Sequence, residues 1–227
     1  MAYTAEELDK LLRSGGLERI GMGSRRSCYR LPGDSRLCLK CYKSDAEILE
    51  GKDPGKAKSR PLAPAAAREI KRCRFEERRN TCCEEYRYWK NVIQTTSPAV
   101  KMIFPSTMEI LDVPSRGWCL LEELMLNDDG SPIVKFLPAW QVAGEADRKR
   151  LASALSELEE SFLRHSIRFF DPQTIMVQRS CGELRLRIPD FEPASRTFIP
   201  VDLLHPAFIR IKTRRRFARY RETWGIQ

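Results

Sequence analysis

The sequence has no apolar run near the about 18 residues that a helix needs to cross a bilayer. Its first residues lack the basic and apolar segments of a secretory signal peptide. It also lacks internal repeats and low-complexity segments. These absences argue against a membrane channel, a fibre and a secreted protein. We expect a cytoplasmic protein without a membrane span.

A second C-x-x-C motif is missing as well. Of the eight cysteines, Cys38 and Cys41 have this spacing, and on a strand two residues three apart point to opposite faces. A shared metal ion is therefore disfavoured. A disulfide framework is also disfavoured in a chain of this length without a signal peptide. We expect reduced, partly buried thiols.

The composition is that of a globular protein, with 42% hydrophobic and 31% charged residues among 227. The net charge is +9, and the positive surplus is concentrated in two segments. Residues 58–79 hold eight Lys/Arg against three Glu, and residues 208–227 hold seven against one. Such segments attract phosphate-bearing partners, although a solvated helix face produces the same pattern.

The first half of the chain predicts a short helix followed by antiparallel strands. Thr4 and Glu7 form a capping box ahead of spaced leucines, and Gly15 ends this helix. Residues 51–64 read as a loop, and residues 65–93 contain no Pro or Gly and favour one or two helices. Apolar patterns and turn signals predict five strands, at residues 17–23, 28–31, 37–42, 106–112 and 118–121.

The second half is mainly helical. A strong turn signal lies at residues 127–130, and we place the boundary between two lobes near residues 124–130. Residues 145–164 carry apolar side chains spaced for one helix face, and residues 175–188 have the pattern of a hairpin. Residues 206–224 form a basic helix. This order of elements predicts an α+β fold.

Four features with chemical potential follow one another along the chain. Gly21 and Gly23 lie in a strand-turn-strand, where small residues let N–H groups approach a phosphate, although a tight hairpin turn explains the same pair. Lys40 lies in an apolar strand and needs an anionic partner unless it faces solvent. Glu84 or Glu85 on the next helix can supply that partner. Asp190, after the hairpin, can bind Mg²⁺ unless it is an ordinary turn residue.

These features occur in the order of the protein-kinase signature set. From about Leu17 to the C-terminus, the chain resembles the YrbL-like proteins, the PhoP regulatory network family of bacteria, which belong to the protein-kinase-like superfamily. The residues that carry the resemblance are 20–30 (Ile-Gly-Met-Gly-Ser-Arg-Arg-Ser-Cys-Tyr-Arg), 38–42 (Cys-Leu-Lys-Cys-Tyr), 85–89 (Glu-Tyr-Arg-Tyr-Trp), 172–176 (Pro-Gln-Thr-Ile-Met) and the segment around Asp190.

The resemblance implies a two-lobed protein-kinase-like fold, with ATP and Mg²⁺ as cofactors. The small antiparallel-sheet N-lobe would be residues 1–124 and the mainly helical C-lobe residues 125–227. The implied nucleotide contacts are Gly21 and Gly23 over the phosphates, Lys40 on the α- and β-phosphates with Glu85 as its partner, and Glu123 and Leu124 in the hinge beside adenine. Asp190 would ligate Mg²⁺.

The sequence departs from the kinase pattern in the catalytic loop. Thr174 aligns with the metal-binding Asn of kinases, so it is a weak metal ligand, and Phe169 then occupies the position of the catalytic base. Asp171, two residues further on, is a weak candidate for that base. Arg26 stands where the third glycine of the loop is expected.

Three functions therefore follow from the sequence. The first is a phosphotransferase with a degenerate catalytic loop, which acts on an unknown protein or small-molecule acceptor. The second is a non-catalytic, pseudokinase-type regulatory module. The third is a nucleic-acid binder that uses residues 58–79 and 208–227. In the second segment arginines are interleaved with aromatic side chains, as in base-stacking surfaces, but the helical spacing of these aromatics favours packing onto the C-terminal lobe.

Overall fold

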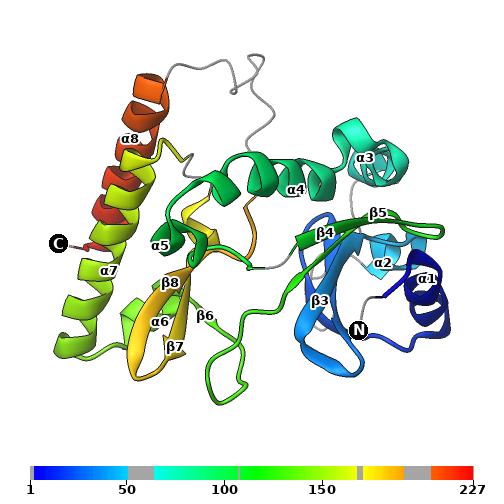
Figure 1. Cartoon of the computed structure of the whole chain (residues 1–227), viewed down its shortest axis with the longest axis horizontal. Helices are drawn as coiled ribbons and strands as arrows, with labels where there is room; N and C mark the ends of the chain where they lie inside the picture. The colour runs from blue at the N-terminus through cyan, green and yellow to red at the C-terminus, as the bar shows by residue number, and fades with distance from the viewer. Residues whose placement is uncertain (1–2, 51–63, 107, 168–170, 192–205, 227) are drawn as a thin grey trace. The chain divides into compact units, whose positions relative to one another are not determined.

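The protein is an α+β chain that divides into two compact units (Figure 1). The computed structural model describes residues 3–50, 64–106, 108–167, 171–191 and 206–226. The first unit comprises Met1–Trp89 and Ser106–Leu124, and the second comprises Lys90–Pro105 and Met125–Gln227. Residues 90–105, which the sequence placed with the N-lobe, thus group with the second unit.

The first unit is built on a five-stranded antiparallel sheet in the order β1-β2-β3-β5-β4. Its strands are β1 (Glu18–Met22), β2 (Arg26–Leu31), β3 (Asp34–Tyr42), β4 (Met108–Val113) and β5 (Gly117–Glu123). The five strands expected from alternation and turn signals are confirmed, with ends that differ by a few residues. β3 and β5 pair directly, although they are far apart in the sequence.

One helix precedes β1 in the sequence, and three helices and a 3₁₀ turn follow β3. They are α1 (Ala5–Ser14), α2 (Asp45–Glu50), α3 (Pro64–Phe75), the 3₁₀ turn η1 (Glu77–Arg79) and α4 (Thr81–Asn91). The capping box of α1 is confirmed: the Glu7 N–H donates to Thr4 Oγ1 at 3.2 Å, and the Thr4 N–H donates to Glu7 Oε2 at 2.8 Å. The sequence pattern did not predict α2. The loop expected at residues 51–64 lies outside the described residues except for Pro64, which begins α3.

The two faces of β3 have different chemistry because successive side chains alternate. Leu39 and Cys41 lie in an apolar cluster with Leu8 of α1 and with residues of the neighbouring strands. Cys38 and Lys40 point to the other face. The pattern of β3 therefore separates an apolar core from a polar site on one strand.

The second unit combines a small sheet with long helices. Its elements are η2 (Ile93–Thr95), α5 (Pro98–Lys101), β6 (Val134–Lys135), α6 (Phe136–Val142), α7 (Glu145–Arg164), η3 (Pro172–Thr174), β7 (Met176–Ser180), β8 (Glu183–Arg187) and α8 (Pro206–Trp224). The sheet order is β6-β7-β8. The helices expected at residues 145–164 and 206–224 are confirmed. No helix within the described ranges is long and apolar enough to cross a membrane.

Aromatic side chains form the core of the second unit. Phe104 packs edge-on against Phe191 with ring centroids 5.1 Å apart, and stacks with Phe162 at 6.0 Å. Phe162 in turn meets Phe217 of α8 at 6.1 Å. The hairpin of β7 and β8 is also confirmed. Its turn has positive φ angles at Cys181 and Gly182, 52° and 76°, as two-residue hairpins favour.

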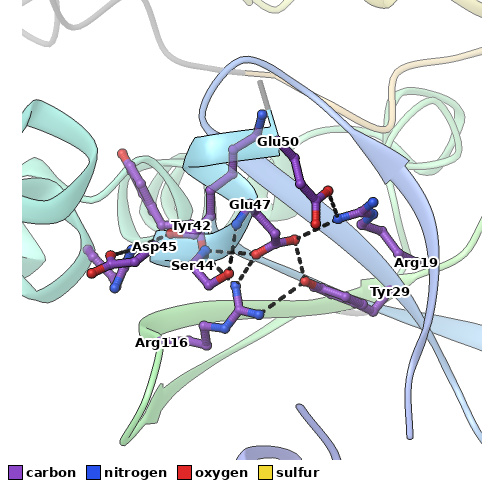
Figure 2. A network of polar contacts seen from close by, with 10 residues as sticks. Arg19, Tyr29, Tyr42, Ser44, Asp45, Glu47, Glu50 and Arg116 are labelled. Atoms are coloured by element: carbon purple, nitrogen blue, oxygen red, sulfur yellow. Dashed lines mark hydrogen bonds and ion pairs between the residues drawn. The ribbon is translucent and has the colours of Figure 1, made fainter. Parts of the chain in front are cut away.

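A polar network fastens α2 to the sheet of the first unit (Figure 2). Glu47 of α2 is buried and accepts hydrogen bonds from Tyr29 Oη and Arg116 Nη1, each at 2.5 Å, and from the Ser44 N–H at 2.7 Å. Burial by itself would raise the pKa of Glu47, but these hydrogen bonds and the charge of Arg116 lower it to about 2. The ionised carboxylate is therefore the form that the folded chain stabilises.

We expect Glu47 to make stability depend on pH in the acid range. The unfolded carboxyl has a pKa near 4.5. Its contribution is therefore complete above about pH 4.5 and is lost as the pH falls toward 2. Glu47→Gln should lower the free energy of unfolding by about 3 kcal/mol at neutral pH and flatten its acid slope. Urea titrations between pH 2 and 7 measure this. The exposed Glu50→Gln variant is the control, and an acid slope unchanged in Glu47→Gln would contradict the assignment.

Gly117, at the start of β5, lies where a side chain has no room. Its φ is +65°, a conformation that costs non-glycine residues free energy. A Cβ atom there would overlap the carbonyl oxygen of Arg74 and lie 2.8 Å from the carbonyl carbon. The end of α3 therefore packs against the β4–β5 turn at backbone distance.

We expect Gly117→Ala to destabilise the chain by about 3 kcal/mol, because strain and overlap add. Gly33→Ala is the matched control: its φ is +78°, but no atom lies within 4 Å of the added Cβ. It should cost about 1 kcal/mol. Urea denaturation compares the two variants, and equal losses would show that the close approach to Arg74 has no effect.

Candidate functional site

The buried charges on the polar face of the first-unit sheet form an ion cluster. Lys40 Nζ lies 2.7 Å from Glu122 Oε1 and 3.5 Å from Glu85 Oε1. Arg26 Nη1 donates to Glu85 Oε2 at 2.6 Å. We call these four residues the Lys40 cluster. Both carboxylate side chains are buried, whereas the Lys40 side chain keeps 10% of its surface exposed.

Three strands and one helix bring these charges together. Arg26 begins β2, Lys40 lies in β3 and Glu122 lies in β5. In the pairing of β3 with β5, Lys40 is opposite Leu120 and Cys38 is opposite Glu122. Lys40 and Glu122 are therefore diagonal neighbours on one face, within reach of a long side chain. Glu85 reaches the same point from α4.

Asn80 positions α4 over the sheet. Its Oδ1 accepts from the Cys82 N–H at 2.9 Å and so caps the first turn. Its Nδ2 donates to the carbonyl oxygens of Arg74 and Trp118, at 3.0 and 3.2 Å. One fully buried amide thus connects the end of α3, the start of α4 and strand β5. This connection sets where Glu85 meets Lys40.

The two carboxylates of the Lys40 cluster have different surroundings. Glu85 has Arg26 and Lys40 beside it, whereas the ammonium of Lys40 is the cation beside Glu122. Burial raises the pKa of Glu122 well above its usual range, Lys40 opposes this rise and the charge of Glu85 adds to it. Glu122 Oε2 is buried and has no hydrogen-bond partner within the described part of the chain. A buried oxygen in this state costs free energy unless a proton or a ligand satisfies it.

Sequence reasoning found Lys40 and Glu85 but missed the other half of the cluster. Arg26 was interpreted as the residue that replaces a glycine, and the structure gives it the carboxylate of Glu85 as partner. Glu122 was not singled out. The signal for it is the same as for Lys40: a charged residue at the end of the buried run Cys-Leu-Leu in β5.

Gly21 and Gly23 lie at the β1–β2 hairpin, next to Arg26. The Gly23 N–H donates to the Arg26 carbonyl oxygen at 2.8 Å, which closes the turn. A Cβ on Gly21 would lie 3.7 Å from Cys28 Cβ, and one on Gly23 would lie 3.6 Å from that same Arg26 oxygen. Both are ordinary contacts. The backbone therefore does not require glycine at either position. A requirement for small residues here would come from a ligand bound against the hairpin.

Glu123 is the last residue of β5, and Leu124 follows it at the end of the first unit. Glu123 Oε2 accepts a hydrogen bond from the Ser106 N–H at 2.6 Å. The Leu124 N–H donates to the Arg36 carbonyl oxygen at 2.7 Å, which extends the pairing of β3 and β5. This N–H is thus occupied within the unit, and an adenine ring would have to compete with Arg36 for it.

Asp171 and Thr174 come together in the second unit around η3. Asp171 Oδ1 accepts from the Gln173 N–H at 2.9 Å and so caps this short turn. Thr174 Oγ1 donates to the Asp171 carbonyl oxygen at 2.6 Å. Both side chains have a local structural role. Phe169, the residue at the position expected for a catalytic base, lies outside the described residues.

Asp190 follows β8 and is half-buried beside Phe191, which is fully buried against Phe104. No group of three or more His, Cys, Asp or Glu side chains that could hold a metal ion occurs among the described residues. Mg²⁺ in nucleotide sites is held by one or two carboxylates and by phosphate oxygens, so a single well-placed Asp190 is compatible with that ion.

The structure thus brings Lys40 and Glu85 together in the first unit, and Asp171 and Thr174 in the second. All eight cysteines are free thiols, and Cys38 and Cys41 lie on opposite faces of β3.

Comparison with models of known protein families gave no match, and neither did comparison with curated proteins.

We expect Glu122 to lower stability as the pH rises from about 5 to 8. The native carboxyl holds its proton to a higher pH than the unfolded one, whose pKa is near 4.5. The unfolded chain therefore binds fewer protons in this range, and stability falls by up to about 1.4 kcal/mol per pH unit. In Glu122→Gln this slope should disappear, as urea titrations across the range would show.

Glu85→Gln is the matched variant for this prediction. It leaves Arg26 buried without its carboxylate, and removing one partner of a buried ion pair costs about 3–5 kcal/mol. We expect that loss at every pH between 5 and 8. If Glu122→Gln and wild type have the same slope, Glu122 is ionised in the folded chain and the assignment is wrong.

Proposed function

We propose that the protein is a protein-kinase-like, nucleotide-binding protein of the cytoplasm, similar to the YrbL-like family, in which Lys40 contacts the phosphates of ATP. The observation that carries this proposal is the buried Lys40 on β3, paired with Glu85 of α4 beside a glycine-containing hairpin. The order of the five strands and the position of α4 support the resemblance that the sequence suggests.

The energetics of the Lys40 cluster favour a role beyond folding. Replacing a buried ion cluster by apolar residues of similar volume is often neutral or stabilising. Stability alone therefore does not account for four charges on one face of a small sheet. When Glu122 holds its proton, the four residues of the Lys40 cluster together carry a net charge of +1. This surplus suits an anion such as a phosphate.

In this proposal Asp190 would ligate Mg²⁺, an ion that neutralises phosphate charge. Thr174 contributes less, since its hydroxyl already donates to the Asp171 carbonyl oxygen. Gly21 and Gly23 would allow the β1–β2 hairpin to lie close to the phosphates. Whether phosphate then passes to a protein or small-molecule acceptor depends on a base.

A non-catalytic, pseudokinase-type regulatory module is the second candidate, and a specific observation favours it. Asp171, the weak candidate for the base, accepts the Gln173 N–H as the cap of η3. The oxygen that accepts this N–H is already engaged in the turn, so it is less available to accept a proton from a substrate. Binding without turnover is the result that this candidate requires.

Thermal unfolding with ATP or ADP, with and without Mg²⁺, tests the proposal. A nucleotide at about 100 times its Kd adds roughly 2.7 kcal/mol, which for this size raises Tm by about 5–10 °C. We expect this shift in wild type and in Arg116→Met, which breaks a buried ion pair elsewhere in the first unit. We expect none in Lys40→Met.

Gly21→Ala is a second test variant in case Lys40→Met does not fold. Its added Cβ makes only ordinary contacts, so we expect it to fold. Its Tm without ligand should match wild type, while the nucleotide shift is reduced. The proposal fails if wild type shows no shift, or if Lys40→Met keeps it. Phosphate release from ATP, compared between wild type and Asp171→Asn, then separates the two candidates: the non-catalytic module predicts none in either.

A further inference from the structure

The basic helix α8 uses its apolar side to pack within the second unit. Phe217 meets Phe162, Tyr220 meets Phe136 with ring centroids 6.0 Å apart, and Thr213 Oγ1 donates to the Ile167 carbonyl oxygen at 3.3 Å. These α8 side chains are buried. Figure 1 shows α8 beside α7, and Arg221 pairs with Glu159 of α7. One side of α8 is therefore already occupied.

The opposite side of α8 carries cations that face solvent. Lys212, Arg215 and Arg219 are exposed and recur at helical spacing, so they share one stripe. We call these three residues the α8 basic stripe. None of the three forms an ion pair with any carboxylate in the described ranges of the chain. With about 1.5 Å of rise per residue, the stripe extends about 10 Å along the helix.

We propose that the α8 basic stripe binds the phosphate backbone of double-stranded DNA. Charge complementarity carries this inference: residues 206–224 hold seven Lys/Arg against one Glu, and no carboxylate of the described residues pairs with the stripe. Two of its three cations are arginines, whose planar guanidinium groups suit phosphate oxygens. A rigid helix also presents its cations in a row, as a regularly spaced polyanion requires.

An anionic membrane fits α8 less well. A helix that lies in a bilayer interface buries a continuous apolar face and exposes its charges. In α8 the buried aromatic side chains already contact α6 and α7. The exposed large apolar side chains of α8 are Phe208 and Ile211 near its N-terminal end and Trp224 at its C-terminal end, so they form no continuous face, and Lys212 Nζ lies 4.9 Å above the Phe208 ring. Little apolar surface is left to enter lipid.

The inference is independent of the proposed nucleotide site. It uses residues of the second unit, whereas the Lys40 cluster lies in the first. It also differs in its dependence on salt, because displaced counterions make backbone binding fall steeply as salt rises. Loss of nucleotide binding in Lys40→Met would leave it untouched.

Fluorescence anisotropy of a labelled 20-base-pair DNA duplex, measured from 50 to 200 mM KCl, tests the inference. Three phosphate contacts predict that a fourfold rise in salt weakens binding by roughly 40-fold or more. The variant Lys212→Gln, Arg215→Gln, Arg219→Gln should bind more weakly, with the slope of log affinity against log salt reduced by about 2.7. Glutamine keeps a good helix propensity.

A matched triple variant on the neighbouring helix is the control. Lys149, Arg150 and Arg164 of α7 are exposed, with side chains at least 67% accessible, and their replacement by glutamine removes the same charge from the same unit. We expect wild-type affinity and slope for it, and far-ultraviolet circular dichroism checks that both triple variants fold.

Three results would overturn the inference. The first is no duplex binding by wild type at 50 mM KCl. The second is an equal loss of affinity in the two triple variants, which would mean that net charge alone decides. The third is binding only to vesicles of phosphatidylserine and phosphatidylcholine, lost in the α8 variant, which would make the stripe a membrane contact.

Discussion

The buried pairing of Lys40 with Glu85 and Glu122 is the constraint on which the first unit depends. A buried charge is tolerated only when a partner is held at bonding distance. Here the partners come from β5 and α4, and Arg26 of β2 completes the set. The register of three strands and the placement of a helix must therefore agree for these four side chains to meet, and Asn80 holds the helix in that position.

Two buried polar networks in the same unit illustrate different uses of charge. Glu47 receives hydrogen bonds on both carboxylate oxygens, from Tyr29 and from Arg116, and its pKa is lowered. It acts as an anchor for α2. Glu122 keeps one oxygen without a partner in the described structure, and its pKa is raised. A ligand would therefore stabilise the Lys40 cluster more than the Glu47 network, because the cluster has a buried oxygen without a partner in the described structure and Lys40 beside it is partly exposed.

The second unit is stabilised by aromatic packing instead. Phe104 lies between Phe162 and Phe191, and Phe162 extends the contact to Phe217. These contacts bury the apolar side of α8, so its cations face solvent. The burial of Phe217 and Tyr220 agrees with the helix-packing interpretation of the aromatic side chains in the basic C-terminal segment. Phe217 is a core residue, whereas the arginines and the lysine on the far side are what a partner can meet.

The sequence alone determined the elements whose signals are local: the capping box at Thr4, the apolar spacing of α7, the turn at Gly182 and the charged residue within the apolar strand at Lys40. Tertiary structure decided which distant groups those elements meet. Lys40 and Glu122 are 82 positions apart, and only the antiparallel pairing of β3 with β5 makes them neighbours. The physical reason is that propensity and capping act within a few residues, whereas strand register and burial depend on the whole chain at once.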